Sequence, residues 1–276
     1  MKTAVFVPDE LRTTDVLVVG GGVAGLNAAL HAEGRRVILV GKTPFSKGGS
    51  SVHAQGGVAV ALGDNDSPTR HAVDTIAAGA GLCDPDVVRR ITDSGPERIG
   101  ELLAIGARLD REEDGRLSLG REAAHSRRRV AHAAGDATGH ELVRALAHAV
   151  HVADWVEIES DILVLDLVMD HGTVAGAVAV DRDGRRILYI TSEVVLATGG
   201  IGHLWLHTTN PPEVSGDGLA MAIRAGARVA DLEFVQFHPT ALAVDTSPMP
   251  LLTEALRGEG ARLVDGFGRR FMLSEH

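Results

Sequence analysis

The sequence predicts an α/β protein with a buried parallel sheet and a small antiparallel insertion. Apolar runs at residues 15–19, 36–40 and 194–200 show no helical period and are bounded by glycines, which is typical of buried parallel strands. A helical pattern over residues 20–34 joins the first two runs into a β-α-β unit. Over residues 155–190 the pattern changes to strands with a hairpin turn, which indicates the antiparallel insertion.

Further helices are expected between these strands, and prolines mark a change of subdomain near the end. The helical patterns cover residues 68–80, 84–105, 139–150 and 216–226. Three prolines between positions 239 and 250 interrupt the pattern. We therefore predict one domain over residues 1–235 and the start of a second unit over residues 236–276. The 276-residue chain ends soon after a glycine turn, so we expect this second unit to be truncated.

Composition excludes several classes of function. The net charge of -10 argues against a dominant nucleic-acid or anionic-membrane footprint. No apolar stretch is as long as a membrane span, and residues 1–12 contain no signal-peptide core. The single cysteine, Cys83, excludes an intramolecular disulfide and a cysteine-based metal cluster, and the histidines lack metal-ligand spacing. We expect a cytoplasmic protein with no bound metal.

A glycine-rich motif stands at the first strand-to-helix junction. Gly20, Gly22 and Gly25 match G-x-G-x-x-G directly after a predicted strand and before a predicted helix. In that context the glycines permit a tight turn, close approach to a pyrophosphate and close helix-strand packing. The pyrophosphate is expected at the helix N-terminus. The alternative is a plain glycine-rich turn. The expected binding residues are Gly20, Gly21, Gly22, Val23, Ala24 and Gly25.

The ribose-binding acid that usually follows this motif is missing. It is expected about twenty residues on, at the end of the second strand, where the sequence has Gly41 and Lys42. The missing carboxylate weakens the case for NAD bound in the standard way. The arrangement is compatible with FAD whose ribose is held by backbone and Lys42.

Several separated segments resemble one family. They are residues 18–26, 54–57, 121–129, 135–139, 195–200, 209–211, 215–218, 233–240 and 252–260. In their order and spacing they resemble the L-aspartate oxidases, within the larger group that includes the flavoprotein subunits of succinate dehydrogenase and fumarate reductase. The resemblance spans nearly the whole chain and about half of a family member. It implies a Rossmann-like FAD-binding domain over residues 1–235, lacking its returning C-terminal segment, and the truncated start of a substrate-capping domain over residues 236–276.

The resemblance also implies further FAD-binding residues and a non-covalent cofactor. Those residues are Ser50, Ser51, Ala54, Gln55, Gly56, Gly57, Ala197, Thr198, Gly199 and Asp217. In succinate dehydrogenases and many fumarate reductases, a histidine five positions before the glutamine bonds covalently to FAD. Ser50 stands at that offset from Gln55, and His53 is out of register, so we expect dissociable FAD. Asp217 has an alternative interpretation as the N-cap of the helix that follows.

Five residues match the family's substrate and proton-transfer positions. Glu122 would meet the substrate amino group, because an ammonium beside the reacting carbon needs a nearby anion. His238 and Thr253 would bind a substrate carboxylate, and Glu254 with Arg257 would form a proton relay. Two structural alternatives stay open. Glu122 can pair with a neighbouring arginine, and Glu254 with Arg257 can be an ordinary salt bridge on an exposed helix.

The segment around Glu122 combines an arginine cluster with one departure from the family. The cluster at residues 127–129 is expected to balance Glu122 and the anionic ligands rather than to bind nucleic acid. The family usually has two glycines where this chain has Ala123 and Ala124. That departure bears on the conformation of the loop.

The activity that the resemblance implies is FAD-dependent oxidation of L-aspartate to iminoaspartate, with dioxygen or fumarate as electron acceptor. The product would feed quinolinate and NAD synthesis, with possible association with quinolinate synthase. The family's principal catalytic arginine follows soon after the point where this chain ends, so we expect the 276 residues alone to bind FAD poorly and to turn over no aspartate. The alternatives are a soluble fumarate reductase or succinate dehydrogenase flavoprotein, which Ser50 and Glu122 argue against, and a nucleotide-binding fragment without catalysis.

Overall fold

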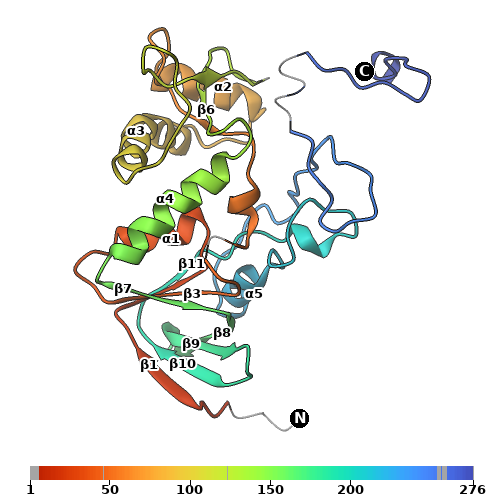
Figure 1. Cartoon of the computed structure of the whole chain (residues 1–276). Coiled ribbons are helices and arrows are strands. Elements are labelled where there is room, and N and C mark those ends of the chain that lie inside the picture. Colours follow the sequence, from red (N-terminus) through yellow and green to blue (C-terminus); the bar gives the residue numbers. More distant parts are fainter. Residues whose placement is uncertain (1–5, 46, 123, 254–255, 257–259, 276) are drawn as a thin grey trace.

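The protein is described here by a computed structural model that covers residues 6–45, 47–122, 124–253, 256 and 260–275. In these residues a parallel sheet is sandwiched between two helices and an antiparallel sheet (Figure 1). A smaller unit of two helices and three very short strands adjoins this body. The last part of the chain, drawn in blue, extends away from the sheets (Figure 1).

The parallel sheet has four strands in the order β11-β2-β3-β7. Their bounds are β2 (Val16–Val19), β3 (Val37–Gly41), β7 (Val156–Ser160) and β11 (Val194–Leu196). All three pairings are parallel, as the β-α-β pattern predicts. The sequence prediction was wrong about β7, which belongs to this sheet and not to the antiparallel insertion. Its sequence alternates apolar and polar residues because it is an edge strand, and this pattern resembles that of an antiparallel strand.

Two helices cover one face of the parallel sheet. These are α1 (Val23–Leu30) and α4 (Thr138–Val152), and their apolar residues pack with Val16, Val18, Val37 and Leu39. The alternate residues of the same strands, such as Leu17 and Val40, face the other way. Both faces are therefore buried, which is why the strands show continuous apolar runs. Helix α1 ends at Leu30, earlier than the pattern indicates.

An antiparallel sheet covers the opposite face. Its order is β1-β10-β9-β8, with bounds β1 (Glu10–Thr13), β8 (Ile162–Asp170), β9 (Thr173–Asp181) and β10 (Arg186–Ile190). Side chains such as Val164, Ala177, Ile187 and Tyr189 form one core with the parallel sheet. Strand β1 was not expected, because its alternating polar sequence lies on an edge and pairs in parallel with β10.

The adjoining unit carries the arginine-rich segment. It consists of β4 (Val58–Ala59), α2 (Pro68–Ala78), α3 (Pro85–Ala104), β5 (Leu119–Gly120) and β6 (Val130–Ala131). Strands β5 and β6 pair antiparallel and enclose residues 121–129 as a loop. Val60, Ile99 and Leu109 form the centre of its separate core.

The remaining elements are short, and most lie in the second half of the chain. They are η1 (Ser50–His53), η2 (Gly202–Leu204), α5 (Asp217–Arg224) and α7 (Met272–Glu275). Between α5 and α7, an isolated bridge joins Ala241 to Leu251. None of the helices in the described ranges is long and apolar enough to cross a membrane.

Candidate functional site

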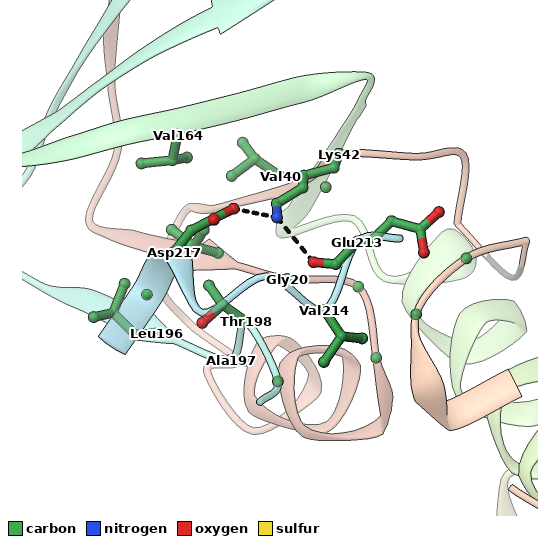
Figure 2. A pocket seen from close by; sticks show the side chains of 18 of the residues that line it. Gly20, Val40, Lys42, Val164, Leu196, Ala197, Thr198, Glu213, Val214 and Asp217 are labelled. Carbon is green, nitrogen blue, oxygen red and sulfur yellow. Dashed lines mark hydrogen bonds and ion pairs between the residues drawn. The ribbon is translucent and has the colours of Figure 1, made fainter. Parts of the chain in front are cut away.

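A cavity of about 590 Å³ opens at the carboxyl ends of β2, β3 and β11 (Figure 2). Residues at those strand ends, including Gly20, Lys42 and Thr198, line one side of it. Val164 of β8 and Met221 of α5 line another side. Ligands of open α/β sheets bind in such a crevice, because the strand ends and helix N-termini converge there. Its volume lies in the range of about 300–1,000 Å³ that is usual for ligand pockets.

The glycine-rich junction forms the floor of the cavity and admits no side chains at two positions. Gly20 has a φ of 116°, and a Cβ built on it would lie 2.2 Å from the carbonyl oxygen of Ala197 in the next strand. A Cβ on Gly25 would lie 1.8 Å from the Gly20 carbonyl oxygen. The turn therefore needs the first glycine for its conformation and the last for helix-strand packing, as the motif predicts.

The N-terminus of α1 borders the cavity, where Gly22 and Ala24 are among the lining residues. No side chain of its own N-cap, Gly22, accepts from the N–H groups of the helix start. The backbone N–H of Val23 donates instead to Ser51 Oγ at 3.2 Å, so the η1 loop supplies an oxygen at the helix start. The ring of Phe45 covers Gly21 from the other side. Gly48, Gly49 and Ser50 of the same segment also line the cavity, together with Ser51.

Lys42 lies at the centre of a polar cluster at one end of the cavity (Figure 2). Its ammonium forms an ion pair with Asp217 and donates to the Glu213 carbonyl oxygen at 2.9 Å and to Ser215 Oγ at 3.0 Å. Ser215 Oγ also donates to Asp217 Oδ1 at 3.0 Å. The cluster therefore brings a carboxylate to the end of β3, where the sequence has no acid of its own. Asp217 is the first residue of α5 and not its N-cap, which is Gly216.

The structure brings together most of the residues expected to bind a dinucleotide. The cavity is lined by Gly20, Gly21, Gly22, Ala24, Lys42, Ser50, Ser51, Ala197, Thr198, Gly199 and Asp217. Val23 and Gly25 lie in the helix behind this lining. The segment 54–57 lies further along the chain, where the N–H of Gly139 at the start of α4 donates to the Ala54 carbonyl oxygen at 2.9 Å. A Cβ on Gly139 would collide with that loop, so α4 and η1 are in backbone contact.

Glu122 lies over the 54–57 segment and has no ion pair within the described residues. Its Oε1 is 3.3 Å from where a Cβ on Gly56 would stand. The nearby Gln55 Oε1 is buried without a hydrogen-bond partner. Pairing of Glu122 with a neighbouring arginine, the ordinary alternative, is thus not what this part of the structure shows. A half-buried carboxylate and a buried amide oxygen together suit a cationic donor group.

The expectation that the arginine cluster balances Glu122 was wrong for Arg129. Its side chain is fully buried and forms ion pairs with Asp66 at 2.8 Å and Asp74 at 2.7 Å. These two partners are in and just before α2, about sixty positions away in the sequence. Burial alone would lower the pKa of Arg129, but the two carboxylates raise it, so the guanidinium stays charged. Arg128 lines a different hollow, beside Asp64 and Arg116.

His238 and Thr253 lie in two neighbouring segments of irregular structure. The Nδ1 atom of His238 is 2.8 Å from the Thr240 carbonyl oxygen. Thr240 Oγ1 donates to the Leu252 carbonyl oxygen at 3.0 Å, and the N–H of Leu252 donates back at 3.2 Å to the Thr240 carbonyl oxygen. The two predicted substrate residues are therefore brought into the same part of the molecule. Glu254 and Arg257 lie outside the described residues.

Sequence reasoning missed several residues of the cavity. Phe45, Ile162, Val164, Leu196 and Met221 give it an apolar wall. They follow no motif, and only Leu196 lies in a strand that was expected to be buried. Glu213 also lines the cavity, and its Oε2 atom is buried without a hydrogen-bond partner in the described part of the chain. No group of three or more metal-ligating side chains occurs among the described residues.

The fold and the cavity define the class: an α/β protein whose first β-α-β unit presents a glycine cradle and a helix N-terminus to an elongated nucleotide. A family model described as "FAD binding domain" matches residues 15–276, and the chain belongs to this family. The cofactor is therefore FAD. The glycine cradle, the apolar wall and the Lys42 cluster fit the diphosphate, ring and ribose parts of such a molecule.

The curated proteins that the chain is similar to include L-aspartate oxidases. The chain is 49% identical over 256 residues to the L-aspartate oxidase of Mesorhizobium japonicum, covering 93% of this chain and 50% of that protein. For Streptomyces coelicolor the identity is 50% over 280 residues, covering 98% and 48%. The chain thus spans about half the length of the curated relatives it matches. The solved structure of the FrdA subunit of E. coli quinol fumarate reductase superposes with a TM-score of 0.90 at 32% identity, covering 96% of this chain and 45% of that one.

Proposed function

We propose that this chain is the FAD-binding part of an L-aspartate oxidase, which oxidises L-aspartate to iminoaspartate with dioxygen or fumarate as electron acceptor. The single observation that carries the proposal is Glu122, a carboxylate over the 54–57 loop that forms no ion pair within the described residues, in a chain about half identical to L-aspartate oxidases. Succinate and fumarate have no amine. In a site that binds only dicarboxylates, such an anion would repel the substrate and contact no cationic group of it.

The cofactor is assigned to the cavity at the strand ends. The diphosphate is proposed to lie on residues 20–25 at the start of α1, where N–H groups and the helix dipole favour negative charge. Asp217 and Lys42 are proposed to hold the ribose, with Ala197, Thr198 and Gly199 along the β11 end. Bound FAD would supply the two-electron acceptor of the reaction. Since Ser50 has no nucleophilic imidazole, we propose that FAD is held without a covalent bond.

The substrate is assigned to the loop side of the same site. Ser50 to Gly57 would lie against the flavin, and Glu122 would hold the α-ammonium of aspartate above them. His238 and Thr253 would bind a carboxylate through an imidazole and a hydroxyl. Glu254 and Arg257, whose placement is not described, are proposed from the sequence alone as the proton relay. In this scheme the protein contributes orientation and charge, because a correctly held α-carbon removes much of the entropic barrier.

The division of the chain and the cellular role follow from the same proposal. Residues 1–235 would form the FAD-binding domain and residues 236–276 the start of a capping domain. We further propose a cytoplasmic protein whose product enters NAD synthesis by way of quinolinate, with quinolinate synthase as a possible partner.

A soluble fumarate reductase or succinate dehydrogenase flavoprotein is the second candidate, and the superposition on fumarate reductase favours it. Substitution of Glu122→Gln in the full-length protein discriminates between the two. If Glu122 holds an ammonium, the KM for aspartate should rise about tenfold or more, because a charge-assisted contact is lost, while succinate binding stays nearly constant. Equal effects on aspartate and succinate would favour the second candidate.

A further inference from the structure

The loop that carries Glu122 is fastened to α2 by a partly buried charge cluster, which we name the Arg129 cluster and define as Asp66, Asp74, Ser126 and Arg129. The guanidinium of Arg129 donates through Nε and NH2 to the two oxygens of Asp66, at 2.8 and 2.9 Å. Its NH1 donates to Asp74 Oδ2 at 2.7 Å. The side chains of Arg129 and Asp66 are completely buried. Buried charges persist only when they are paired and hydrogen-bonded, so this geometry is tightly specified.

Asp74 connects the cluster to the loop. Its Oδ2 also accepts from the backbone N–H of Ser126 and from Ser126 Oγ, both at 2.8 Å. The Ser126 N–H, with its hydroxyl and Arg129, lowers the pKa of Asp74 to about 2. The carboxylate is therefore ionised at neutral pH and binds the loop through charge-assisted hydrogen bonds.

The loop in turn fixes Glu122. The N–H of His125 donates to the Glu122 carbonyl oxygen at 3.1 Å, and Arg121 Nε donates to the His125 carbonyl oxygen at 3.0 Å. At the base, the N–H of Arg129 donates to the Gly120 carbonyl oxygen at 3.0 Å. The backbone of Glu122 is thus tied to His125, and this part of the loop is held at Ser126 on one side and by the β5–β6 pair on the other.

The cluster also occupies the Arg129 guanidinium completely. All three nitrogens of the Arg129 guanidinium are engaged by Asp66 and Asp74, and NH1 lies 3.4 Å from His125 Nδ1 as well. An arginine so fully occupied cannot turn to Glu122 without leaving the buried Asp66 unpaired and breaking its contact with Asp74, which is strongly unfavourable.

We propose that the Arg129 cluster positions Glu122 and makes it selective for an amine. Through Asp74 and Ser126 the cluster holds Glu122 over Gly56. Because Arg129 is fully occupied, the Glu122 carboxylate stays available for the ammonium group of an amino dicarboxylate. The proposal rests on the proposed function of Glu122. None of the four residues of the cluster lines the 590 Å³ cavity, so they act through the loop. Weakening the Asp74–Ser126 contact should therefore impair recognition of an amine more than recognition of a carboxylate.

The test uses the full-length, FAD-loaded protein and Ser126→Ala, which removes only the hydroxyl contact to Asp74. A matched control is Ser94→Ala, because Ser94 Oγ donates to the Ile91 carbonyl oxygen on the exposed face of α3. We expect Ser126→Ala to raise the KM for aspartate about tenfold, in line with one lost charge-assisted hydrogen bond that positions Glu122, with kcat less affected. The inhibition constant of succinate, which lacks the amine, should change by less than about twofold on the same grounds. Ser126→Thr, which keeps the hydroxyl, should restore the KM.

The proposed function and the positioning role of the Arg129 cluster are contradicted by different outcomes. If the parent protein is not reduced by aspartate at all, the proposed function fails and the inference fails with it. If the parent is active and Ser126→Ala shifts aspartate and succinate equally, or shifts neither, the positioning role is wrong while the proposed function stands. A second variant, Asp74→Asn, compared with Asp114→Asn at an exposed ion pair, should show the same selective loss.

Discussion

Gly25→Ala tests whether the start of α1 holds the diphosphate. A Cβ at this position would lie 1.8 Å from the Gly20 carbonyl oxygen and 2.9 Å from its carbonyl carbon, whereas real Cβ atoms approach no closer than 3.0 Å. The helix must therefore move from the β2–α1 turn by more than an ångström. Insertion of a methyl group into a packed site costs about 1–3 kcal/mol.

That cost falls on the cofactor site because the displaced helix N-terminus forms its floor. We expect the dissociation constant of FAD to rise roughly ten- to a hundredfold if about 1.4 to 3 kcal/mol of the strain opposes binding. The measurement is a fluorescence titration of the FAD-free protein with FAD. Gly22→Ala is a milder variant, because its Cβ would lie 2.9 Å from the movable Ser51 Oγ.

Gly100→Ala is the matched control for this experiment. Gly100 lies within α3, and a Cβ there would meet no atom within 4 Å. The control should bind FAD as the parent does and gain about 0.5–1 kcal/mol of stability from helix propensity. A folded Gly25→Ala protein that binds FAD as tightly as the parent would refute the reasoning.

Three other substitutions probe the charges of the molecule. Lys42→Met should weaken FAD binding about tenfold, since it leaves the Asp217 carboxylate unpaired in the cavity. The control Lys47→Met, at an exposed site, should leave FAD binding unchanged. Equal FAD affinities of the two variants would contradict the role of Lys42. Burial raises the pKa of Glu159 above its ordinary value of 4.5, so the charge of Glu159 opposes folding once the pH exceeds 4.5. Glu159→Gln should therefore raise the melting temperature at pH 7 and have little effect on it near pH 4. The pKa of Asp74 is lowered from 3.8 to about 2, chiefly by the Ser126 N–H, so its charge stabilises the fold above about pH 4, and this contribution is lost as the pH falls towards 2. Asp74→Asn should accordingly cost about 2 kcal/mol in urea unfolding at pH 7, and a loss that persists unchanged at pH 2 would count against this account.

The parts of the fold that were predictable are those where local sequence determines local structure. Strands β2 and β3 are buried on both faces, so their runs are continuously apolar, and the motif between them specifies the turn and the helix. Strands β1 and β7 are sheet edges with only partly buried residues, and nothing in their sequence shows which sheet they join.

In the candidate site, too, only the features with a local cause could be predicted. Gly20, Gly22 and Gly25 were found because their spacing has a local cause. The roles of Asp217 beside Lys42 and of Asp66 and Asp74 around Arg129 depend on contacts across 50 to 180 positions, where any one charge looks like an ordinary surface residue. Such pairings are determined by the packing of whole elements, which a single sequence does not reveal.

The central claim is that FAD in the cavity beside β2, β3 and β11 is reduced by aspartate held at Glu122. The most direct test is the absorbance spectrum of the purified full-length protein before and after anaerobic addition of aspartate. The account predicts a yellow protein whose flavin absorbance is bleached by aspartate. A protein that takes up no FAD, or a bound flavin that aspartate leaves oxidised while succinate reduces it, would contradict the account.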